Sequence, residues 1–546
     1  MNSQSNQAMQ LTTAIPAILK RQDKTFEKRQ TGETISRDES NNSSRRISPT
    51  LAERFSFAVQ TPIDWLLKIS CATYPTFLAA FRLLPPSYLV WASEVRARRA
   101  YYHALRTVPA YEKFVSENTG SGLPETDKES YVKKYSTADR CAGGSFFRES
   151  TMIDESSGST GTPYNWVRSD HERRESHVFI SYFASYCYGN KPWITINGFS
   201  MGAWATGINM GIALQKNGVV KNTGPDIPKI LHTLRFFGPE YTYLISGYPP
   251  FLKHLIDVAE AEGFPLEDYT LYGLAGGEGM SEGLRDYLLR HFEKVYSGYG
   301  ATDLEIGIAG ETPISVALRR LARERDDVRL ALFGHDSRLP MVFQYNPLMH
   351  HIEVNENSEV IFTISRSTLL SPRIRYNVHD VGGVMTTDEM DERLAAVGVD
   401  LKKLRAECGD GNVRLPFLWI YGRRDYTVSV MGANIYPEDI EQCLYQDTEL
   451  AQLTNSFCLA LAEGANGAVR PRFLFEVAAE PSPELAKRFA DSIIPKLVKL
   501  NADFREAWRE YPETLVPDIQ LYKIGEGPFS GDKGKIKQTR FLTPVS

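Results

Sequence analysis

Short apolar runs alternate with helical patterns between about residues 190 and 300, and this alternation limits the fold more than any other feature of the chain. "KPWITINGF" predicts a strand followed by a turn. "PPFLKHLIDVAEAEG" predicts a helix that begins at proline and ends at glycine. "YTLYGLAGGEGM" and "KVYSGYGATD" each predict a strand followed by a loop. Repeated strand–loop–helix units favour an α/β sheet whose functional site lies at the loop ends.

The length of the chain predicts more than one domain. With 546 residues it exceeds what a single hydrophobic core usually supports, so we expect at least two domains. The net charge of −5 gives no field that favours nucleic acid, and we expect no nucleic-acid partner. The six cysteines form no CxxC pair, which favours reduced thiols in a cytoplasmic protein.

The N-terminal region divides into a polar segment and an apolar one. Residues 1–50 are rich in polar side chains and poor in aromatic ones, and we expect a disordered tail. The apolar segment that follows, "DWLLKISCATYPTFLAAFRLLPPSYLVW", is interrupted by Lys68, Arg82 and Pro85–Pro86, so we expect no transmembrane segment. We interpret it as a helical layer packed on the core rather than as a segment that lies on a membrane surface.

The second half of the chain predicts a change of architecture. Residues 311–350 are charged and irregular, which indicates an inserted helix and hairpin. After them, "SEVIFTISRSTLLSPRIRYNVHDVGGVM" predicts two β-rich segments around a turn. Strand, helix and strand patterns near the end predict a small α+β domain. We therefore expect a tail (1–50), a large α/β domain with mixed sheets and flanking helices (51–424), and a small C-terminal α+β domain (425–546).

The stretch "SSGSTG", Ser156 to Gly161, combines hydroxyl side chains with glycines. Glycines let backbone N–H groups turn toward one centre, and hydroxyls add further donors, so the loop can hold anionic oxygens. A flexible surface linker has the same composition. The GxxxxGK[ST] pattern of phosphate-binding NTPases is absent, so a kinase-like function is disfavoured.

Four later segments carry chemistry in a definite order. "SGYGATD" offers Tyr299, whose ring can stack on a base, and Asp303, whose oxygens suit Mg²⁺. "RIRYNVHD" ends in Asp380, a carboxylate able to hold a ribose diol. "YGRRDYTVSVMGANIYPEDIE" places Arg423 and Asp425 at the expected domain junction. "FSGDKGKIKQTRF" is a glycine-flanked lysine cluster near the end of the chain.

With all five segments in sequence, the chain resembles the adenylate-forming superfamily of acyl-CoA ligases, peptide-synthetase adenylation domains and luciferases. It is most similar to the phenylacetate–CoA ligase branch. "SSGSTGTP", "YGATD", "SRSTLLSPRIRYNVHD", "GRRD…GANIYPEDIE" and "GDKGK" carry the resemblance, which covers roughly residues 95 to 546. The ordered set is far more specific than any one motif.

The resemblance implies a role for each matching residue, with ATP, Mg²⁺ and CoA as cofactors. Lys535 would be the mobile catalytic lysine, and Asp425 the hinge about which the C-terminal domain turns. Asp303 would lie near Mg²⁺. The residues implied for ATP are Ser156, Ser157, Gly158, Ser159, Thr160, Gly161, Gly277, Glu278, Tyr299, Gly300, Thr302, Asp380 and Arg423. Those implied for the acyl pocket are Phe199, Met201, Trp204, Tyr248 and Ala275.

The sequence departs from the family pattern at four positions. Tyr164 stands where the phosphate loop usually continues with lysine, so one phosphate contact is in doubt. Asp303 is one methylene shorter than the usual glutamate, and His379 precedes Asp380 where glycine or arginine is usual. Lys533 is a rival to Lys535 for the catalytic role. His350–His351 and His379 suggest a metal site, but no third ligand appears at a recognised spacing, so no transition metal is expected.

The resemblance implies ATP-dependent activation of a carboxylic acid as its acyl-adenylate, with release of pyrophosphate and transfer to CoA. Phe199, Met201 and Trp204 favour an apolar or aromatic acid. An amine or a carrier protein as acceptor stays open, as does a catalytically silent nucleotide-binding member of the same fold. We expect small-molecule partners and no membrane span, and a homodimer is open.

Overall fold

The computed structural model covers most of the chain. All described elements lie in the second of two units into which the chain divides, residues 1–48 and 49–546. The described residues are 48–118, 122–156, 164–336, 338–366, 369–423, 428–430, 433–463, 469–510 and 512–530. None of their helices is long and apolar enough to cross a bilayer. All six cysteines are unpaired, as their spacing predicts.

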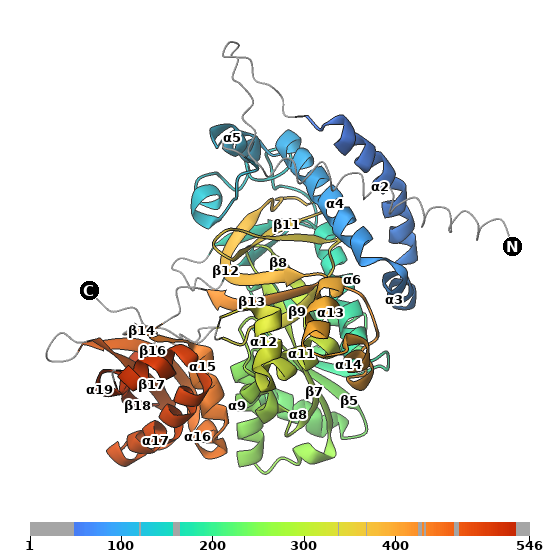
Figure 1. The fold of residues 1–546 in the computed structure, drawn as a ribbon. Coiled ribbons are helices and arrows are strands. Elements are labelled where there is room, and N and C mark those ends of the chain that lie inside the picture. The colour runs from blue at the N-terminus through green and yellow to red at the C-terminus, as the bar shows by residue number, and fades with distance from the viewer. Residues whose placement is uncertain are drawn as a thin grey trace. The chain divides into compact units, whose positions relative to one another are not determined.

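Eleven strands of the described residues form one mixed sheet (Figure 1). From β4 to β7 neighbouring strands are parallel, and from β7 to β10 they are antiparallel. The strands in spatial order are β4 (Val219–Asn222), β3 (Ile194–Asn197), β5 (Thr242–Gly247), β6 (Thr270–Gly276), β7 (Phe292–Ala301), β8 (Glu305–Gly310), β9 (Met341–Tyr345), β13 (Phe417–Arg423), β12 (Tyr376–Met385), β11 (Glu359–Ile364) and β10 (His350–Val354). The α/β fold expected from residues 190–300 is confirmed in the parallel half.

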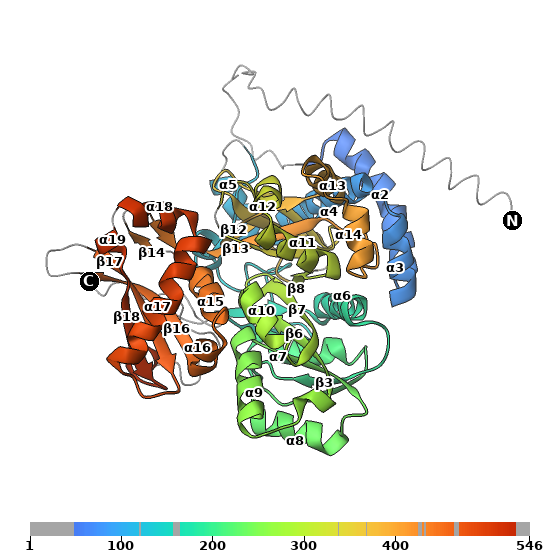
Figure 2. The same ribbon diagram turned by 60° about the horizontal axis from the view of Figure 1, so that its bottom comes forward.

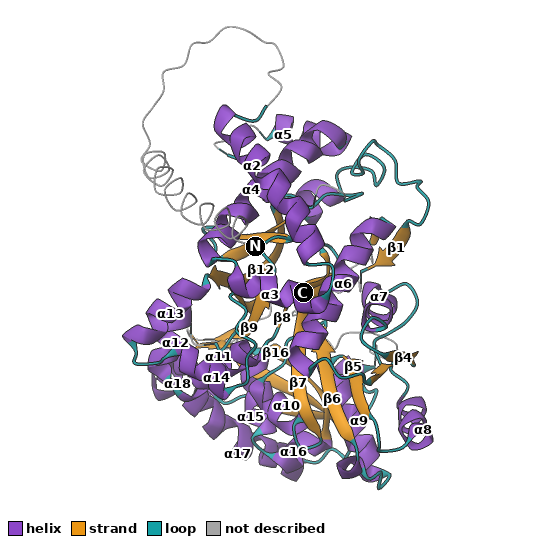
Figure 3. Cartoon of the chain, turned by 90° about the vertical axis from the view of Figure 1, so that its right-hand side faces the viewer, coloured by secondary structure: helices purple, strands orange, loops and turns teal. Residues whose placement is uncertain are grey.

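Helices connect the strands of the parallel half and cover it (Figure 3). Tyr243, Leu244 and Ile245 of β5 are fully buried, as in parallel strands with both faces covered. Carboxyl ends of β5, β6 and β7 therefore lie together beneath the loops that follow them. The helices and helical turns here are α6 (Asp170–Tyr188), α7 (Ala205–Leu214), α8 (Ile227–Phe237), α9 (Pro249–Ala261), η2 (Leu266–Asp268) and α10 (Glu282–Leu288). The helical turn η1 (Lys128–Val132) instead follows Thr126, which forms a bridge with Tyr376 of β12.

An N-terminal helical layer precedes the sheet, as the apolar segment predicts (Figure 1). Its helices are α2 (Leu51–Ser70), α3 (Tyr74–Leu83), α4 (Pro86–Thr107) and α5 (Pro109–Glu117). The capping box of Thr50 and Glu53 starts α2. One side of α2 packs on α4, where Asp64 pairs with Arg96 at 2.6 Å. The layer is thus part of the core.

The expectation of one inserted helix and a hairpin in residues 311–350 is wrong. The segment forms two helices, α11 (Pro313–Glu324) and α12 (Asp326–Phe333), and then β9, which is fully buried between β8 and β13. Its charges were interpreted as the sign of an insertion, but Arg319 is buried and pairs with Glu282 of α10 at 2.9 Å. Helices α13 (Thr387–Ala396) and α14 (Leu401–Glu407) follow on the same half of the sheet.

The C-terminal elements, from β14 on, are grouped around α17 in Figure 2. They have a hydrophobic core of their own, built around Phe473, Phe475 and Phe489. A three-stranded sheet has the order β16-β17-β18. The elements are β14 (Val428–Val430), β15 (Ala433–Ile435), α15 (Pro437–Tyr445), α16 (Thr448–Leu453), β16 (Thr454–Glu463), β17 (Val469–Val477), α17 (Pro483–Leu500), α18 (Ala502–Glu510), α19 (Pro512–Leu515), β18 (Asp518–Lys523) and η3 (Gly527–Phe529). The predicted boundary at 424/425 falls outside the described residues.

Candidate functional site

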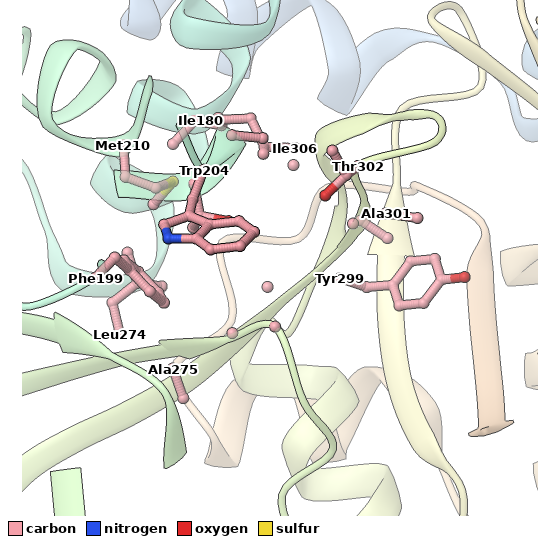
Figure 4. Close-up of a pocket in the computed structure, with 18 of the residues that line it drawn as sticks. Ile180, Phe199, Trp204, Met210, Leu274, Ala275, Tyr299, Ala301, Thr302 and Ile306 are labelled. Atoms are coloured by element: carbon pink, nitrogen blue, oxygen red, sulfur yellow. The ribbon is translucent and has the colours of Figure 1, made fainter. Parts of the chain in front are cut away.

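A cavity of about 120 Å³ lies at the carboxyl ends of β6 and β7 (Figure 4). Of the residues predicted for the acyl pocket, Phe199, Trp204, Tyr248 and Ala275 line it. Of those predicted for ATP, the cavity lining includes Gly277, Tyr299, Gly300 and Thr302. The structure therefore brings the two predicted groups to one cavity. Glu155 is the only charged side chain among its described lining residues.

The predicted nucleotide and acyl residues touch at Gly277 and Tyr248. Gly277 has φ +84°, and a Cβ added there would lie 2.5 Å from Cε1 of Tyr248. Only glycine fits both the backbone conformation and this close approach. Tyr248 in turn meets the ring of Phe199 edge to face at 5.3 Å. Burial raises the pKa of the Tyr248 phenol, so this side chain is a neutral wall of the cavity.

Helix α6 and strand β8 complete the wall, and the sequence reading missed both. Phe179, Ile180 and Phe183 of α6 line the cavity, with Ile306 of β8. In Figure 4, Ile180, Ile306 and Met210 lie around the indole of Trp204. The run "FISYFASY" in the helix after the phosphate loop is the signal that could have indicated this wall.

Tyr299 and Asp380, predicted for base and ribose, lie side by side. The Tyr299 hydroxyl donates to Oδ2 of Asp380 at 2.6 Å. In Figure 4 the Tyr299 ring points away from the indole of Trp204. Asp380 of β12 pairs in register with Arg423 of β13, so the backbone of the third predicted residue is adjacent. The three positions are therefore adjacent in the fold, although they are far apart in sequence. Tyr299 lines the cavity, whereas Asp380 is not among its lining residues.

Ser156 and Tyr164 form hydrogen bonds at the base of the loop that the sequence predicts to bind phosphate. The Tyr164 N–H donates to the Ser156 hydroxyl at 2.9 Å, and the Ser156 N–H donates to the Tyr164 carbonyl at 2.9 Å. Strands β1 (Met152–Glu155) and β2 (Asn165–Arg168) form the hairpin beneath. Two cations lie beside the Tyr164 ring, Arg140 at 5.4 Å and Lys128 at 5.9 Å. Positive charge is therefore present beside Tyr164, which stands where the family loop usually has lysine.

Two buried arginines hold the turn that carries Asp303. Arg168 donates to the carbonyls of Thr302 and Leu304, each at 2.5 Å, and pairs with Asp154 at 2.8 Å. Arg373 donates to the carbonyl of Asp303 at 2.8 Å. Three successive carbonyls are thus fixed by guanidinium groups. Neither arginine was predicted, because backbone acceptors leave no mark in the sequence.

The Asp303 carboxylate accepts a hydrogen bond from the Tyr376 hydroxyl at 2.9 Å. Burial and the charge of Asp303 raise the pKa of Tyr376 well above its ordinary value, so the phenol stays a donor. The described residues contain no group of three or more His, Cys, Asp or Glu side chains that could hold a metal ion. Mg²⁺ bound with a nucleotide takes only one or two protein carboxylates, and Asp303 fits that requirement.

A buried ionic cluster lies behind the turn and was not predicted. Glu305 accepts hydrogen bonds from Arg366, His350 and Ser176. Burial alone would raise the pKa of Glu305, but Arg366 and His350 hold it far below its ordinary value. His350 is thus a partner of a buried carboxylate.

Several predicted residues are not placed in the cavity or are not described. The lining residues of the cavity do not include Met201, Glu278, Ser156, Asp303 or Asp380. The Arg423 side chain is not described. Those outside the described residues are Ser157, Gly158, Ser159, Thr160, Gly161, Asp425, Lys533 and Lys535. Their roles stay predictions.

Comparisons with known proteins agree with the fold. No family model matches the chain, and no curated protein matches it either. Among solved structures, 2-hydroxyisobutyryl-CoA ligase in the postadenylation state with 2-HIB-AMP is similar, with 13% identity, 83% of this chain and 89% of that chain covered, and a TM-score of 0.59. The same ligase with R3-HIB-AMP gives 14% identity, the same coverage and a TM-score of 0.55. The described fold is that of the adenylate-forming ligases.

Proposed function

We propose that this protein is an ATP-dependent carboxylate ligase, which activates an apolar or aromatic acid as its acyl-adenylate and then transfers the acyl group to CoA. One observation carries the proposal: Tyr299, whose hydroxyl donates a hydrogen bond to Asp380, lines the same cavity as Phe199, Trp204 and Tyr248. A nucleoside site and an apolar pocket that share a wall suit a reaction between a nucleotide and an acid. The similar ligase, whose structure holds an acyl-adenylate, supports the same assignment.

In the first step a carboxylate oxygen of the acid attacks the α-phosphorus of ATP. The bond to the bridging oxygen of the β-phosphate breaks, and pyrophosphate leaves with both electrons of that bond. Negative charge on the phosphate oxygens must be balanced by groups placed in advance. Mg²⁺ near Asp303 would neutralise phosphate charge. We assign the remaining stabilisation to the positive charge of Lys535 and to the N–H and hydroxyl donors of the loop Ser156–Gly161.

The residues of the cavity bind and orient the reactants. Asp380 accepts hydrogen bonds from the ribose hydroxyls, beside the hydroxyl of Tyr299. Phe199 and Trp204 exclude water from the acid. Because Arg168 and Arg373 fix the 302–304 carbonyls, the Asp303 carboxylate is held in place during the step. Exclusion of water matters because an acyl-adenylate hydrolyses readily.

In the second step the CoA sulfur attacks the acyl carbon and AMP leaves, with the thiol proton passing to solvent. We propose that the C-terminal elements turn about Asp425 between the steps, which withdraws Lys535. In the described arrangement the Ser281 N–H donates to Glu441 and the Gly283 N–H to Gln442, each at 3.0 Å. Such a turn would have to break these hydrogen bonds between α10 and α15.

The test is pyrophosphate release from ATP and Mg²⁺ in the presence of single acids: straight-chain, branched and aromatic. Release that depends on an acid, followed by mass spectrometry of products with and without CoA, identifies both partners. A CoA thioester supports CoA as the acceptor, and a preference for aryl acetic acids supports closeness to the phenylacetate–CoA ligases. An amide that forms only when an amine is added shows instead that the acceptor is an amine. Nucleotide binding with no acid-dependent release indicates a silent binding protein. A cytoplasmic location stays a prediction.

A further inference from the structure

Helix α2 carries an apolar stripe on the side that faces solvent. Leu51, Phe55, Trp65, Leu66 and Ile69 are each more than half exposed. Their spacing places them on one face of the helix, together with Val59 and Pro62, both exposed. Leu83 at the end of α3 is 82% exposed. Large apolar side chains gathered in this way mark an interaction surface rather than scattered exposure. We call the solvent-facing side of residues 51–84, which carries this stripe and Leu83, the α2–α3 face.

The opposite side of α2 packs against the core. The exposed stripe is therefore not the side by which this helix joins the fold. Leu67 and Gln60 are buried. Asp64 pairs with Arg96 and Arg99 of α4 at 2.6 and 2.7 Å. The sequence interpretation of a packed helical layer is therefore right for the inner side, and it leaves the outer side unexplained.

The charges of residues 51–84 are sorted between the two sides. The two acids of this segment, Glu53 and Asp64, turn inward: Glu53 accepts a hydrogen bond from Tyr102, and Asp64 binds arginines. The exposed charged side chains of the segment are Arg54, Lys68 and Arg82, all positive. An apolar stripe with an aromatic residue and only positive neighbours is the pattern of a helix that lies in the headgroup region of a bilayer.

We propose that the α2–α3 face docks this protein onto the surface of a bilayer that contains anionic lipids. The 20 residues of α2 lie along the membrane plane, with Trp65 and Phe55 among the acyl chains and Arg54 and Lys68 at the headgroups. The helix does not span the bilayer, because its four charged residues forbid it.

A second copy of the chain suits the face less well. Two copies of α2 packed in antiparallel would place Arg54 of one near Lys68 of the other. The inward-facing acids Glu53 and Asp64 are held by Tyr102 and Arg96, so they do not offset that repulsion. Anionic headgroups complement the same cations.

The α2–α3 face lies one helix away from the cavity. The Tyr182 hydroxyl of α6 donates to the carbonyl of Cys71 at 3.2 Å, and its ring lies 5.2 Å from that of Phe77 in α3. Phe179 of α6 belongs to the same hydrophobic cluster as Phe77 and also lines the cavity. A membrane location would suit an enzyme that acts on apolar acids. The docking itself follows from the side chains of the α2–α3 face and does not depend on the reaction.

The test is flotation of the full-length protein with vesicles of phosphatidylcholine alone or mixed with phosphatidylserine. The wild type should float with the mixed vesicles, and high salt should weaken the binding. Phe55→Ser/Trp65→Ser/Leu66→Ser should bind about tenfold or more weakly, because the apolar contact is lost. Arg54→Glu/Lys68→Glu should lose the preference for phosphatidylserine. Because all five side chains are exposed, the thermal unfolding of both variants should match that of the wild type.

The matched control is Val219→Ser/Phe236→Ser/Ile524→Ser, which removes three equally exposed apolar side chains elsewhere and should float like the wild type. The proposal is overturned if the wild type stays unbound with both vesicles, or if the α2 triple variant floats as well as the wild type. It is also overturned if light scattering shows a dimer that the α2 triple variant converts to a monomer while neither binds vesicles. In that case a second copy covers the face.

Discussion

The hydroxyl of Tyr299 donates a hydrogen bond of 2.6 Å to Oδ2 of Asp380, across 81 residues of sequence. The bond joins the end of β7 to β12, and so joins the parallel half of the sheet to the antiparallel half. The sequence predicts that Tyr299 stacks on the base and that Asp380 binds the ribose of one nucleoside. Their contact places the proposed base and ribose sites next to each other, as a nucleoside requires.

Removing either partner should weaken ATP binding more than it slows chemistry. Hydrogen bonds to charged groups contribute about 1.5–3 kcal/mol, so Asp380→Ala should raise the KM for ATP by about tenfold or more. Tyr299→Phe keeps the ring and should cost less. The double variant should lose less than the sum of the two, because the residues share one contact. Strict additivity in steady-state kinetics would show that the pair does not act on the nucleotide together.

Gly298 should set the size of the acid. It lines the cavity, its φ is not positive, and an added Cβ would meet no atom within 4 Å. Gly298→Val should therefore fold normally and lower kcat/KM for the largest accepted acids by about tenfold or more, while smaller acids react as before.

Gly307→Ala is the contrasting variant in the same wall. Its φ is +70°, and the added Cβ would lie 2.6 Å from Cγ1 of Ile180. Gly307→Ala should therefore lower the melting temperature of the protein and lower the activity toward all acids alike. An equal loss of activity toward all acids in Gly298→Val, with unchanged stability, would contradict the assignment of this wall to the acid.

Arg168 should be needed both for stability and for the position of Asp303. The Arg168–Asp154 pair is buried, and removing one partner of such a pair typically costs about 3 kcal/mol or more, so Arg168→Ala should lower the free energy of unfolding by that amount. Arg168→Lys keeps a charge for Asp154 but cannot reach both carbonyls. It should remain folded and form acyl-adenylate more slowly at saturating ATP. Wild-type kinetics in Arg168→Lys would show that the turn at residues 302–304 keeps its position without the Arg168 hydrogen bonds.

The sequence predicted the parallel half of the sheet, because alternating strands and helices report directly on it. The ordered motifs led to Trp204, Tyr248 and Tyr299, which the structure brings to one cavity. It did not predict the wall formed by Phe179 and Phe183, since the apolar face of α6 resembles any helix packed on a core. Arg168 and Arg373 act on backbone carbonyls, which no residue pattern reveals. Residues 311–350 were misread because Arg319, a charged side chain, is buried against Glu282.

Stability should depend on pH through Asp439 of α15. Burial raises the pKa of Asp439 to about 7, although Asn501 donates a hydrogen bond to it at 2.7 Å. The folded protein therefore favours the neutral acid, and the free energy of unfolding should fall as pH rises from about 4 to about 7. Relative to Asp439→Asn, which cannot ionise, the wild type should lose up to about 1.4 kcal/mol per pH unit in this range and nothing further above it. Urea denaturation at several pH values measures this difference, and a constant difference would contradict the raised pKa.

Acid-dependent exchange of labelled pyrophosphate into ATP tests the central claim most directly, because it reports on the reversible formation of an acyl-adenylate and on no other step. With ATP, Mg²⁺ and a suitable apolar acid, the wild type should exchange label, and omission of the acid should abolish it. Lys535→Ala should lower the rate by roughly two to three powers of ten, the scale for losing one preorganised donor, and Lys533→Ala should be nearly normal. The claim is contradicted if the protein binds ATP but exchanges no label with any acid of a broad aliphatic and aromatic panel.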